Sequence, residues 1–499
     1  MRRSQVTLFI IVGFVLLLIF AFFYSFLQDY QTERIDKRII AGKSVEELTD
    51  SYEGYVQSCA NSALRQGIYL IGQQGGVIYD TQVDDGMRFR GPERGFAYGE
   101  YVLPREDDYD DKVYNVSYGI KRPEHDEYRP QVPLYPYGER RLVSDPAETY
   151  DPSYTNVFGN NPSPGPLVPL CDSNGKNMAE GYAVSCETDG RHQSVQAFLE
   201  GFVEEYSLEC VQEEAFPGLN LSYDVLGVNT TSIFSNDEIL VEIYMPVNIT
   251  SEGTTVSPDV SSFEVTQNTR LKLIHELVYH LIENDINDIF FDIVRNANDV
   301  DSCRPWRGTT SGCLKEGMEV SMVRNPCMDI DDIDCGHNNN PEKDANFDNL
   351  LVITDKNNYL FGEPYEFYIA IENRYPALDL LYQDEDLIGH KWDYIVNVSE
   401  ELKIEPKGYD PDSDHHGEYG FMQRHYDYLH IGSDAPYHPT DIGEALMDSE
   451  LYEETERKAT YEPKETDQGN HTIRVRVCNE GGLCDYQDIK VFVNDSISD

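Results

Sequence analysis

The first strong pattern in the chain is an apolar run, Val6–Leu27, that contains no charged residue. Twenty-two residues that each rise about 1.5 Å span roughly 33 Å as a helix, which is enough to cross a bilayer. Arg2 and Arg3 precede the run, and positive residues favour the cytoplasmic side. We therefore expect a cytoplasmic tail over 1–5, a transmembrane signal anchor over 6–27, and the rest of the chain outside the cell. A cleaved signal peptide is disfavoured, because the run is long and no small-x-small site follows it.

Beyond this run, apolar residues recur at helical spacing in three places. The first stripe begins at a capping box formed by Ser44 and Glu47 and ends at Gly75-Gly76. The second helix is predicted over about 192–210, and the third begins at Asn268 or Thr269. Three strand-like segments lie between the last two helices, and the middle one alternates with a period of two: Leu219–Leu226, Glu238–Val247 and Ser262–Thr266. The order of elements predicts an α+β ectodomain over 28–296.

Two segments of the chain lack such periodicity. Residues 77–190 hold twelve of the 25 prolines, mixed with many tyrosines, glycines and aspartates. Because proline fixes φ and removes a hydrogen-bond donor, we expect an irregular Tyr/Pro-rich insertion there. Residues 297–345 form a short acidic segment rich in cysteine.

Evenly spaced strands return after residue 346. Turn residues separate the predicted strands, which are Leu350–Thr354, Tyr365–Ile371, Ile395–Ile404, Thr472–Cys478 and Tyr486–Val493. This spacing indicates an Ig-like β-sandwich region over 346–499. The predicted fold class is thus α+β, with a single N-terminal transmembrane helix, an α+β membrane-proximal domain and a C-terminal Ig-like β-sandwich.

Part of the C-terminal region resembles the PKD/cadherin-like Ig sandwiches. The turn Gly408–Asp414 matches the x-D-P-D-x-D pattern of that family, and the segments Asn470–Val477 and Asp488–Val493 are similar to its closing hairpin. The resemblance covers about 375–496 and departs from the family at an acidic insertion over 420–468. The resemblance implies a β-sandwich fold, and it assigns no catalytic activity.

The whole chain also resembles a family of uncharacterised membrane-anchored surface proteins of small-genome (DPANN) archaea. Four segments carry this resemblance: Gln5–Ile10, Ile71–Gly76, Phe361–Phe367 and Glu372–Asp379. The resemblance implies a location at the cell surface and this architecture, and it assigns no activity.

Charge narrows the set of partners. The chain has 90 Asp and Glu against 39 Lys and Arg, a net charge of -51, which repels phosphate backbones and disfavours nucleic acid as a partner. Acidic residues are spread over the whole chain and lysines are few, which favours a halophilic source organism. In such an organism salt near 1 M screens the repulsion between carboxylates beyond roughly 3 Å. The alternative is an acidic cell-surface protein that holds divalent cations.

Ten cysteines fall largely into close pairs, which is typical of disulfides in an exported protein. Cys478 and Cys484 flank a predicted hairpin turn, and Cys59 with Cys210 remains to join the first two helices. The other predicted bridges are Cys171–Cys186, Cys303–Cys313 and Cys327–Cys335. A zinc cluster of the last four cysteines is the alternative, although no C-x₂₋₄-C spacing supports it.

The sequence contains seven N-x-S/T sequons, so we expect the exported chain to be N-glycosylated. The acceptor residues are Asn115, Asn220, Asn229, Asn248, Asn397, Asn470 and Asn494.

Two groups of residues have ligand-like spacing. Asp410, Asp412 and Asp414 alternate in one turn, so their oxygens could converge on Ca²⁺, or the aspartates could form structural Asx turns. His275 and His280 are five residues apart, about 140° around a helix, so they cannot share one zinc ion as a zincin pair does. We expect these histidines to lie on a helix surface.

No nucleophile elbow, Walker loop or dinucleotide fingerprint is present in the sequence. We therefore expect a non-enzymatic, single-pass protein of the cell membrane that serves adhesion, partner contact or envelope scaffolding. Its expected partners are the membrane and other surface proteins, envelope proteins or glycans, and no cofactor is expected apart from calcium in the Asp410–Asp414 turn. Two alternatives remain open, a pilin-like filament subunit processed before Gln5 and a secreted hydrolase with an accessory Ig-like domain.

Overall fold

The structure is a computed structural model, and it describes part of the chain. The described residues are 45–83, 89, 96–104, 109–122, 167–171, 193–211, 220–223, 227–251, 254–256, 261–287, 292–298, 314–324, 348–374, 377–378, 394–404, 408–409, 412, 428–432, 452–453, 458–478 and 484–495. The predicted anchor 6–27 lies outside these residues. Within them, none of the helices combines the length and the apolar character that a membrane crossing requires.

The longest helix is α2 (Val45–Gln73), which begins directly after the predicted N-cap. It ends where the sequence predicts, because Gly75 and Gly76 adopt φ values of 71° and 90° that glycine tolerates at a helix C-terminus. The Gly76 N–H donates to the carbonyl of Ile71 at 2.8 Å and closes the last turn.

Helix α5 (Val195–Cys210) packs antiparallel along α2. Its N-cap is Ser194, whose side chain accepts a hydrogen bond from the N–H of Ala197. Gly67 of α2 allows the close approach, since a Cβ there would lie 2.7 Å from Leu199. The disulfide Cys59–Cys210 joins the middle of α2 to the last residue of α5.

Both helices contact a three-stranded antiparallel sheet in the order β4-β5-β8. Its strands are β4 (Asn229–Phe234), β5 (Glu238–Tyr244) and β8 (Ser262–Asn268). Alternate residues of each strand are buried, as expected for a sheet with one solvated face. Helices α6 (Leu271–Asn287) and α7 (Ile293–Asn298) follow, and β3 (Asn220–Tyr223), β6 (Val247–Ser251) and β7 (Thr254–Val256) form a separate sheet.

The central element is a five-stranded mixed sheet in the order β1-β2-β11-β10-β9. Its strands are β1 (Tyr98–Pro104), β2 (Tyr109–Ile120), β9 (Met318–Arg324), β10 (Asn349–Leu360) and β11 (Glu363–Ile371). The β2–β11 pair is parallel and the other pairs are antiparallel. Leu351 and Ile353 belong to the core shared with the helices, whereas Leu350 and Val352 belong to a second buried cluster. The sheet is therefore buried on both faces.

This sheet corrects three predictions. Strands β1 and β2 lie inside the insertion 77–190 that was expected to be irregular, and β9 lies inside the cysteine-rich segment 297–345. Strands β10 and β11 were assigned to the C-terminal sandwich over 346–499, but they pair with β2 and β9 instead. The reason is that a strand pattern is local, whereas its partners are chosen across hundreds of residues.

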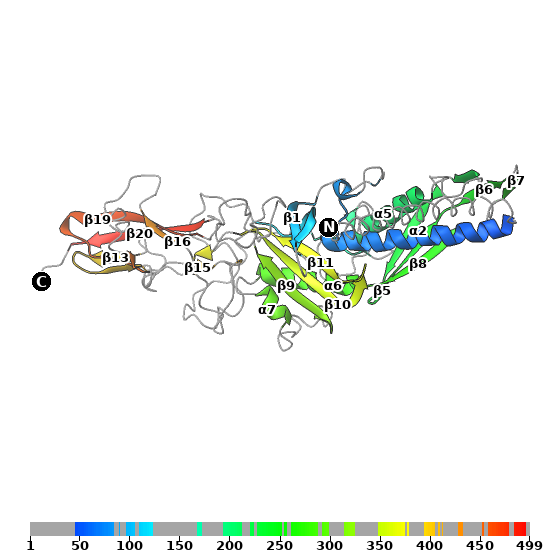
Figure 1. Cartoon of the computed structure of the whole chain (residues 1–499). Helices are drawn as coiled ribbons and strands as arrows, with labels where there is room; N and C mark the ends of the chain where they lie inside the picture. Colours follow the sequence, from blue (N-terminus) through cyan, green and yellow to red (C-terminus); the bar gives the residue numbers. More distant parts are fainter. Residues whose placement is uncertain are drawn as a thin grey trace, which may run out of the picture.

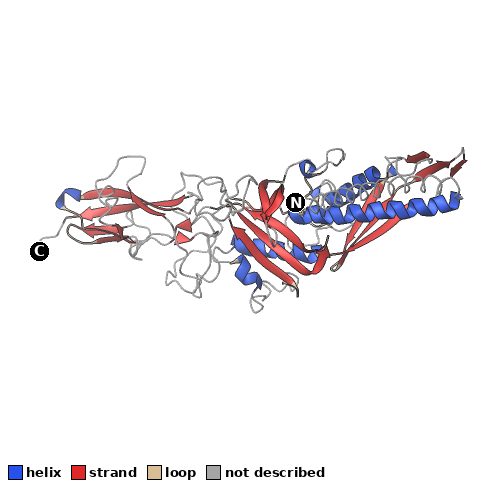
Figure 2. Ribbon diagram, viewed as in Figure 1, coloured by secondary structure: helices blue, strands red, loops and turns tan. Residues whose placement is uncertain are grey.

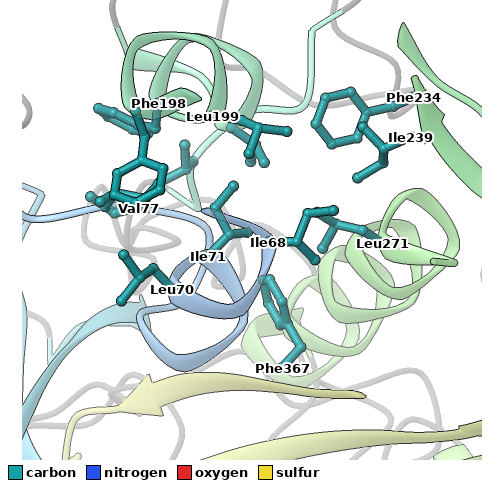
Figure 3. Packing of buried hydrophobic residues seen from close by; sticks show 14 of the residues in the cluster. Ile68, Leu70, Ile71, Val77, Phe198, Leu199, Phe234, Ile239, Leu271 and Phe367 are labelled. Atoms are coloured by element: carbon teal, nitrogen blue, oxygen red, sulfur yellow. The ribbon is translucent and has the colours of Figure 1, made fainter. Parts of the chain in front are cut away.

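The main hydrophobic core lies where α2, α5, α6 and both sheets meet. Figure 3 shows Ile68 and Ile71 of α2 between Leu199 of α5 and Phe367 of β11, with Leu271 of α6 beside them. All five side chains are fully buried. Because the segments come from distant parts of the sequence, this core makes the described residues between 45 and 374 one α+β unit with mixed sheets.

The described elements after residue 374 are strands and one short 3₁₀ helix, Glu465–Asp467 (Figure 2). A four-stranded sheet has the order β13-β20-β19-β16, a three-stranded sheet the order β14-β18-β17, and β12 pairs with β15. The bounds are β12 (Ala377–Leu378), β13 (Tyr394–Asn397), β14 (Leu402–Ile404), β15 (Gly408–Tyr409), β16 (Tyr428–Gly432), β17 (Tyr452–Glu453), β18 (Lys458–Tyr461), β19 (Gly469–Cys478) and β20 (Cys484–Asn494). Strands β19 and β20 form the predicted closing hairpin.

Candidate functional site

Buried charges gather where the chain leaves the five-stranded sheet. Strand β11 ends at Ile371, and the next three residues, Glu372, Asn373 and Arg374, each bind a polar partner from a distant segment. Arg374 is only 2% exposed. Burial of a guanidinium is costly unless it is paired, so its partners define the site.

Arg374 contacts two carboxylates from opposite sides. Its Nη1 donates to Asp285 Oδ2 of α6 at 2.5 Å. Its Nε and Nη2 donate to Asp412 Oδ1 at 3.0 and 2.8 Å. The backbone N–H of Arg374 also donates to Asp412 Oδ2, at 2.6 Å. One arginine thus joins helix α6, the end of β11 and the C-terminal β region, and we call Arg374, Asp285 and Asp412 the junction triad.

The junction triad has a second link to the sheet. Nη1 of Arg324, the last residue of β9, donates to the carbonyl oxygen of Asp412 at 2.7 Å. Both the backbone and the side chain of Asp412 are therefore held by the α+β unit. Because the guanidinium is planar and its donors have fixed directions, these bonds restrict the position of Asp412 against the end of β11.

A second buried carboxylate, Asp348, lies just before β10 and binds Asn373. Its Oδ1 accepts the N–H of Asn373 at 2.9 Å, and its Oδ2 accepts the hydroxyls of Tyr101 and Tyr118 at 2.7 and 2.8 Å. Burial raises the pKa of Asp348, and burial also raises the pKa of both tyrosines above the ordinary value. The phenols therefore stay protonated and act as donors. The result is a clamp that ties β1 and β2 to the end of β11.

A third pair lies at the rim of this cluster. Glu372 accepts the backbone N–H of Arg122 at 2.8 Å, and the Arg122 guanidinium lies 3.4 Å from the other oxygen of Glu372. Both side chains are partly exposed, so the pair contributes little to stability. The junction triad, the Asp348 clamp and the Arg122–Glu372 pair together fix the position of the residues that follow β11.

The predicted calcium turn is corrected at one position. Both carboxylate oxygens of Asp412 bind Arg374, so this side chain is neutralised by a guanidinium and serves as a structural residue. Asp410 and Asp414 lie outside the described residues, and calcium there stays a prediction. Within the described part of the chain, no group of three or more His, Cys, Asp or Glu residues could hold a metal ion.

The cysteines that can be examined are consistent with disulfides. Cys59 is bonded to Cys210, and Cys171 is also disulfide-bonded. Cys478 lies directly opposite Cys484 at the end of the β19–β20 hairpin. The remaining predicted bridges involve Cys186, Cys303, Cys313, Cys327 and Cys335, all outside the described residues, and they stay predictions.

One sequon is buried. Asn115 is 5% exposed, and its amide donates to Thr81 Oγ1 at 3.1 Å, so the folded chain does not present it as a glycan acceptor. Asn229, Asn397 and Asn470 are exposed, and Asn494 is partly exposed. The side chains of Asn220 and Asn248 are not among those that the structure describes. Glycosylation of the sequons other than Asn115 stays a prediction.

The histidine prediction also needs correction. His275 is buried in the core rather than on the helix surface, and its Nε2 lies 2.7 Å from the carbonyl oxygen of Val168. Burial lowers the pKa of His275 to about 4, so the ring is neutral at pH 7 and Nε2 donates this bond. Because its Nδ1 has no hydrogen-bond partner, the residue serves as a core histidine.

Sequence reasoning missed the junction triad, although one signal was available. Asp285 lies four residues after Leu281 and three after Ile282, which places a carboxylate on the apolar face of α6. A charge on a buried helix face calls for a buried partner. Nothing in the sequence identifies that partner as Arg374.

Comparisons with known proteins add little. No family model and no curated protein matches the chain. Among solved structures, immunoglobulin domains 1–4 of Sidekick-1 have a TM-score of 0.17 at 12% identity and cover 36% of this chain and 41% of that chain. The insect immune protein hemolin has a TM-score of 0.16 at 12% identity, with 36% and 39% covered. An endo-fucoidan hydrolase of glycoside hydrolase family 107 has a TM-score of 0.12 at 10% identity, with 56% and 39% covered. The chain spans about two fifths of each, and at these scores none of the likenesses carries an argument.

Proposed function

We propose that this chain is a single-pass, non-enzymatic surface protein whose α+β unit carries a C-terminal Ig-like sandwich away from the membrane for adhesion, partner contact or envelope scaffolding. The anchor over 6–27 would hold it in the cell membrane with the remainder outside. The disulfide Cys59–Cys210 supports an oxidising location, because such bonds are rare in the reducing cytosol.

The direction of α2 supports this arrangement. Its early residue Tyr52 contacts Met245 just after β5, and its late residue Gly72 lies against Tyr365 of β11. Figure 1 shows β5 and the strands β13, β19 and β20 on opposite sides of the central sheet. The start of α2, which follows the predicted anchor, therefore lies at the end of the molecule farther from the C-terminal region. A helix of 29 residues spans about 43 Å.

The observation that carries the proposal is the junction triad. A protein that presents a distal region at a set distance needs a stiff connection, and a buried arginine between two carboxylates supplies one. In this proposal the triad serves orientation more than stability, because the desolvation of a buried ion pair offsets much of its Coulomb attraction.

Two measurements on native cells test the proposal. A membrane-impermeant amine reagent should label the exposed Lys464 in intact cells, and labelling that requires lysis would contradict an outside location. The mass of the N-terminal peptide should show a chain that begins at or next to Met1. A start at Gln5 would point instead to the filament alternative, and a start after residue 27 would exclude the permanent anchor.

A further inference from the structure

The turn between β10 and β11 combines two unusual features. Phe361 and Gly362 both have positive φ, 56° and 93°, and Leu360 pairs directly with Glu363, so the loop has the geometry of a type I′ hairpin turn. The first position of such a turn favours asparagine, aspartate or glycine, and a bulky residue there is strained. The phenylalanine is also 54% exposed, and Tyr359 nearby is 58% exposed. Neither backbone preference nor burial accounts for an aromatic residue at this tip.

A cation lies over this exposed ring. The Arg65 guanidinium of α2 is 4.9 Å from the ring centroid of Phe361, and Tyr69 packs edge-on against the same ring at 5.8 Å. Arg65 forms no salt bridge with any carboxylate of the described chain, and its Nε is buried without a hydrogen-bond partner. The chain has 90 acidic and 39 basic residues, so carboxylates outnumber the cations available to pair with them. We call Arg65, Tyr69, Tyr359 and Phe361 the aromatic turn; arginine and tyrosine are enriched in interface hot spots.

The outward face of the sheet β4-β5-β8 has the opposite character. Glu242 and Glu264 lie directly opposite each other on neighbouring strands, an arrangement of like charges that destabilises a sheet. Neither carboxylate forms a salt bridge with a described cation. Apolar side chains flank them, Ile233 at 60% exposure and Tyr244 at 46%. We call these four residues the acidic face.

We propose that the aromatic turn of one copy binds the acidic face of a second copy. Arg65 would pair with Glu242 or Glu264, while Phe361 and Tyr359 would cover Ile233 and Tyr244. The two surfaces complement each other in both charge and apolar content, which argues for this occupant. Because they are different patches of one molecule, the contact is head-to-tail and propagates into rows rather than closing as a symmetric dimer. Self-association of the purified chain is measured without any partner of the C-terminal region, so its outcome is independent of the function proposed above.

The test measures self-association of the full-length protein in detergent by sedimentation velocity over a range of protein and salt concentrations. The parent chain should associate, and added salt should weaken the association. Arg65→Glu should weaken it at least about tenfold, and so should the double variant Glu242→Arg/Glu264→Arg. A mixture of these two variants should recover association, because each contact again joins opposite charges. The matched control is Lys464→Glu, which reverses an exposed cation in the C-terminal region and should change nothing.

Phe361→Asn separates a contact role from a structural one. Asparagine suits the first position of a type I′ turn, so this variant should keep the thermal midpoint within a few degrees while losing the association. A parent that stays monomeric at every concentration would overturn the proposal, as would an association that the charge reversals leave intact. A monomeric parent that binds an acidic polysaccharide such as alginate through Arg65 would assign the site to a glycan and overturn the second-copy assignment.

Discussion

The two ends of β11 reverse the usual placement of side chains. At its start an aromatic ring projects into solvent beside a strained turn, and at its end an arginine is buried between two carboxylates. Between these ends Phe367 and Ile369 pack in the core as apolar residues ordinarily do. The middle of the strand therefore contributes to the core, whereas the two ends carry the features from which we propose orientation at one end and contact at the other.

Breaking the buried end should have the largest effect. Arg374→Leu removes a buried guanidinium that pairs with both Asp285 and Asp412, so we expect the free energy of unfolding to fall by roughly 3–5 kcal/mol. Urea denaturation at constant salt measures this. Arg122→Gln removes only a rim pair and should cost less than about 1 kcal/mol. A small loss for Arg374→Leu would mean that the two carboxylates find water or other donors and that the junction is not rigid.

Lowering the pH should reduce stability through the buried His275, which lies on the same helix as Asp285. Its pKa is lowered from 6.5 to about 4, so the unfolded chain takes up a proton in this interval and the folded chain does not. Its contribution to stability is complete above pH 6.5 and is lost as the pH falls through 4, by up to about 3 kcal/mol. Unfolding free energies at pH 7 and pH 4.5 should differ less in His275→Gln than in the parent. Equal pH slopes would show that carboxylates alone determine acid sensitivity.

The middle of β11 can be tested through its contact with α2. A Cβ on Gly72 would lie 2.4 Å from the carbonyl oxygen of Glu366, so Gly72→Ala must push the helix away from the strand. We expect a loss of about 1–3 kcal/mol, measured by thermal or urea unfolding. Gly54→Ala is the control, because nothing lies within 4 Å of the added atom and alanine favours the helix. A neutral Gly72→Ala would indicate that the two elements separate easily.

The smallest effect on stability should come from the exposed end. Phe361→Asn relieves the positive-φ strain but removes ring contacts with Arg65 and Tyr69, and these changes should cancel to within about 1 kcal/mol. Phe367→Ala, in β11 and fully buried, should cost about 3–5 kcal/mol. The same unfolding experiment compares the two. If Phe361→Asn costs as much as Phe367→Ala, the aromatic turn is a structural element.

Local patterns determined the helices and the way they end. The apolar stripe, the capping residue and Gly75-Gly76 define α2, and the alternation over β5 and the hairpin β19–β20 are likewise readable from neighbouring residues. These features depend on interactions within a few positions along the chain, which is why sequence reasoning reached them. The bond between Cys59 and Cys210 also follows once the two helices are recognised.

Only the tertiary structure decided which strands share a sheet and which charges meet. The parallel pairing of β2 with β11 joins Tyr118 to Ala370 and Ile120 to Ile371, and no local pattern distinguishes a strand of the central sheet from one of the C-terminal region. Arg374, Asp285 and Asp412 likewise come from three separate segments, and each alone is an ordinary charged residue. Partners in space are selected by the packing of the whole core, so a site built from such contacts becomes visible only when the chain is folded.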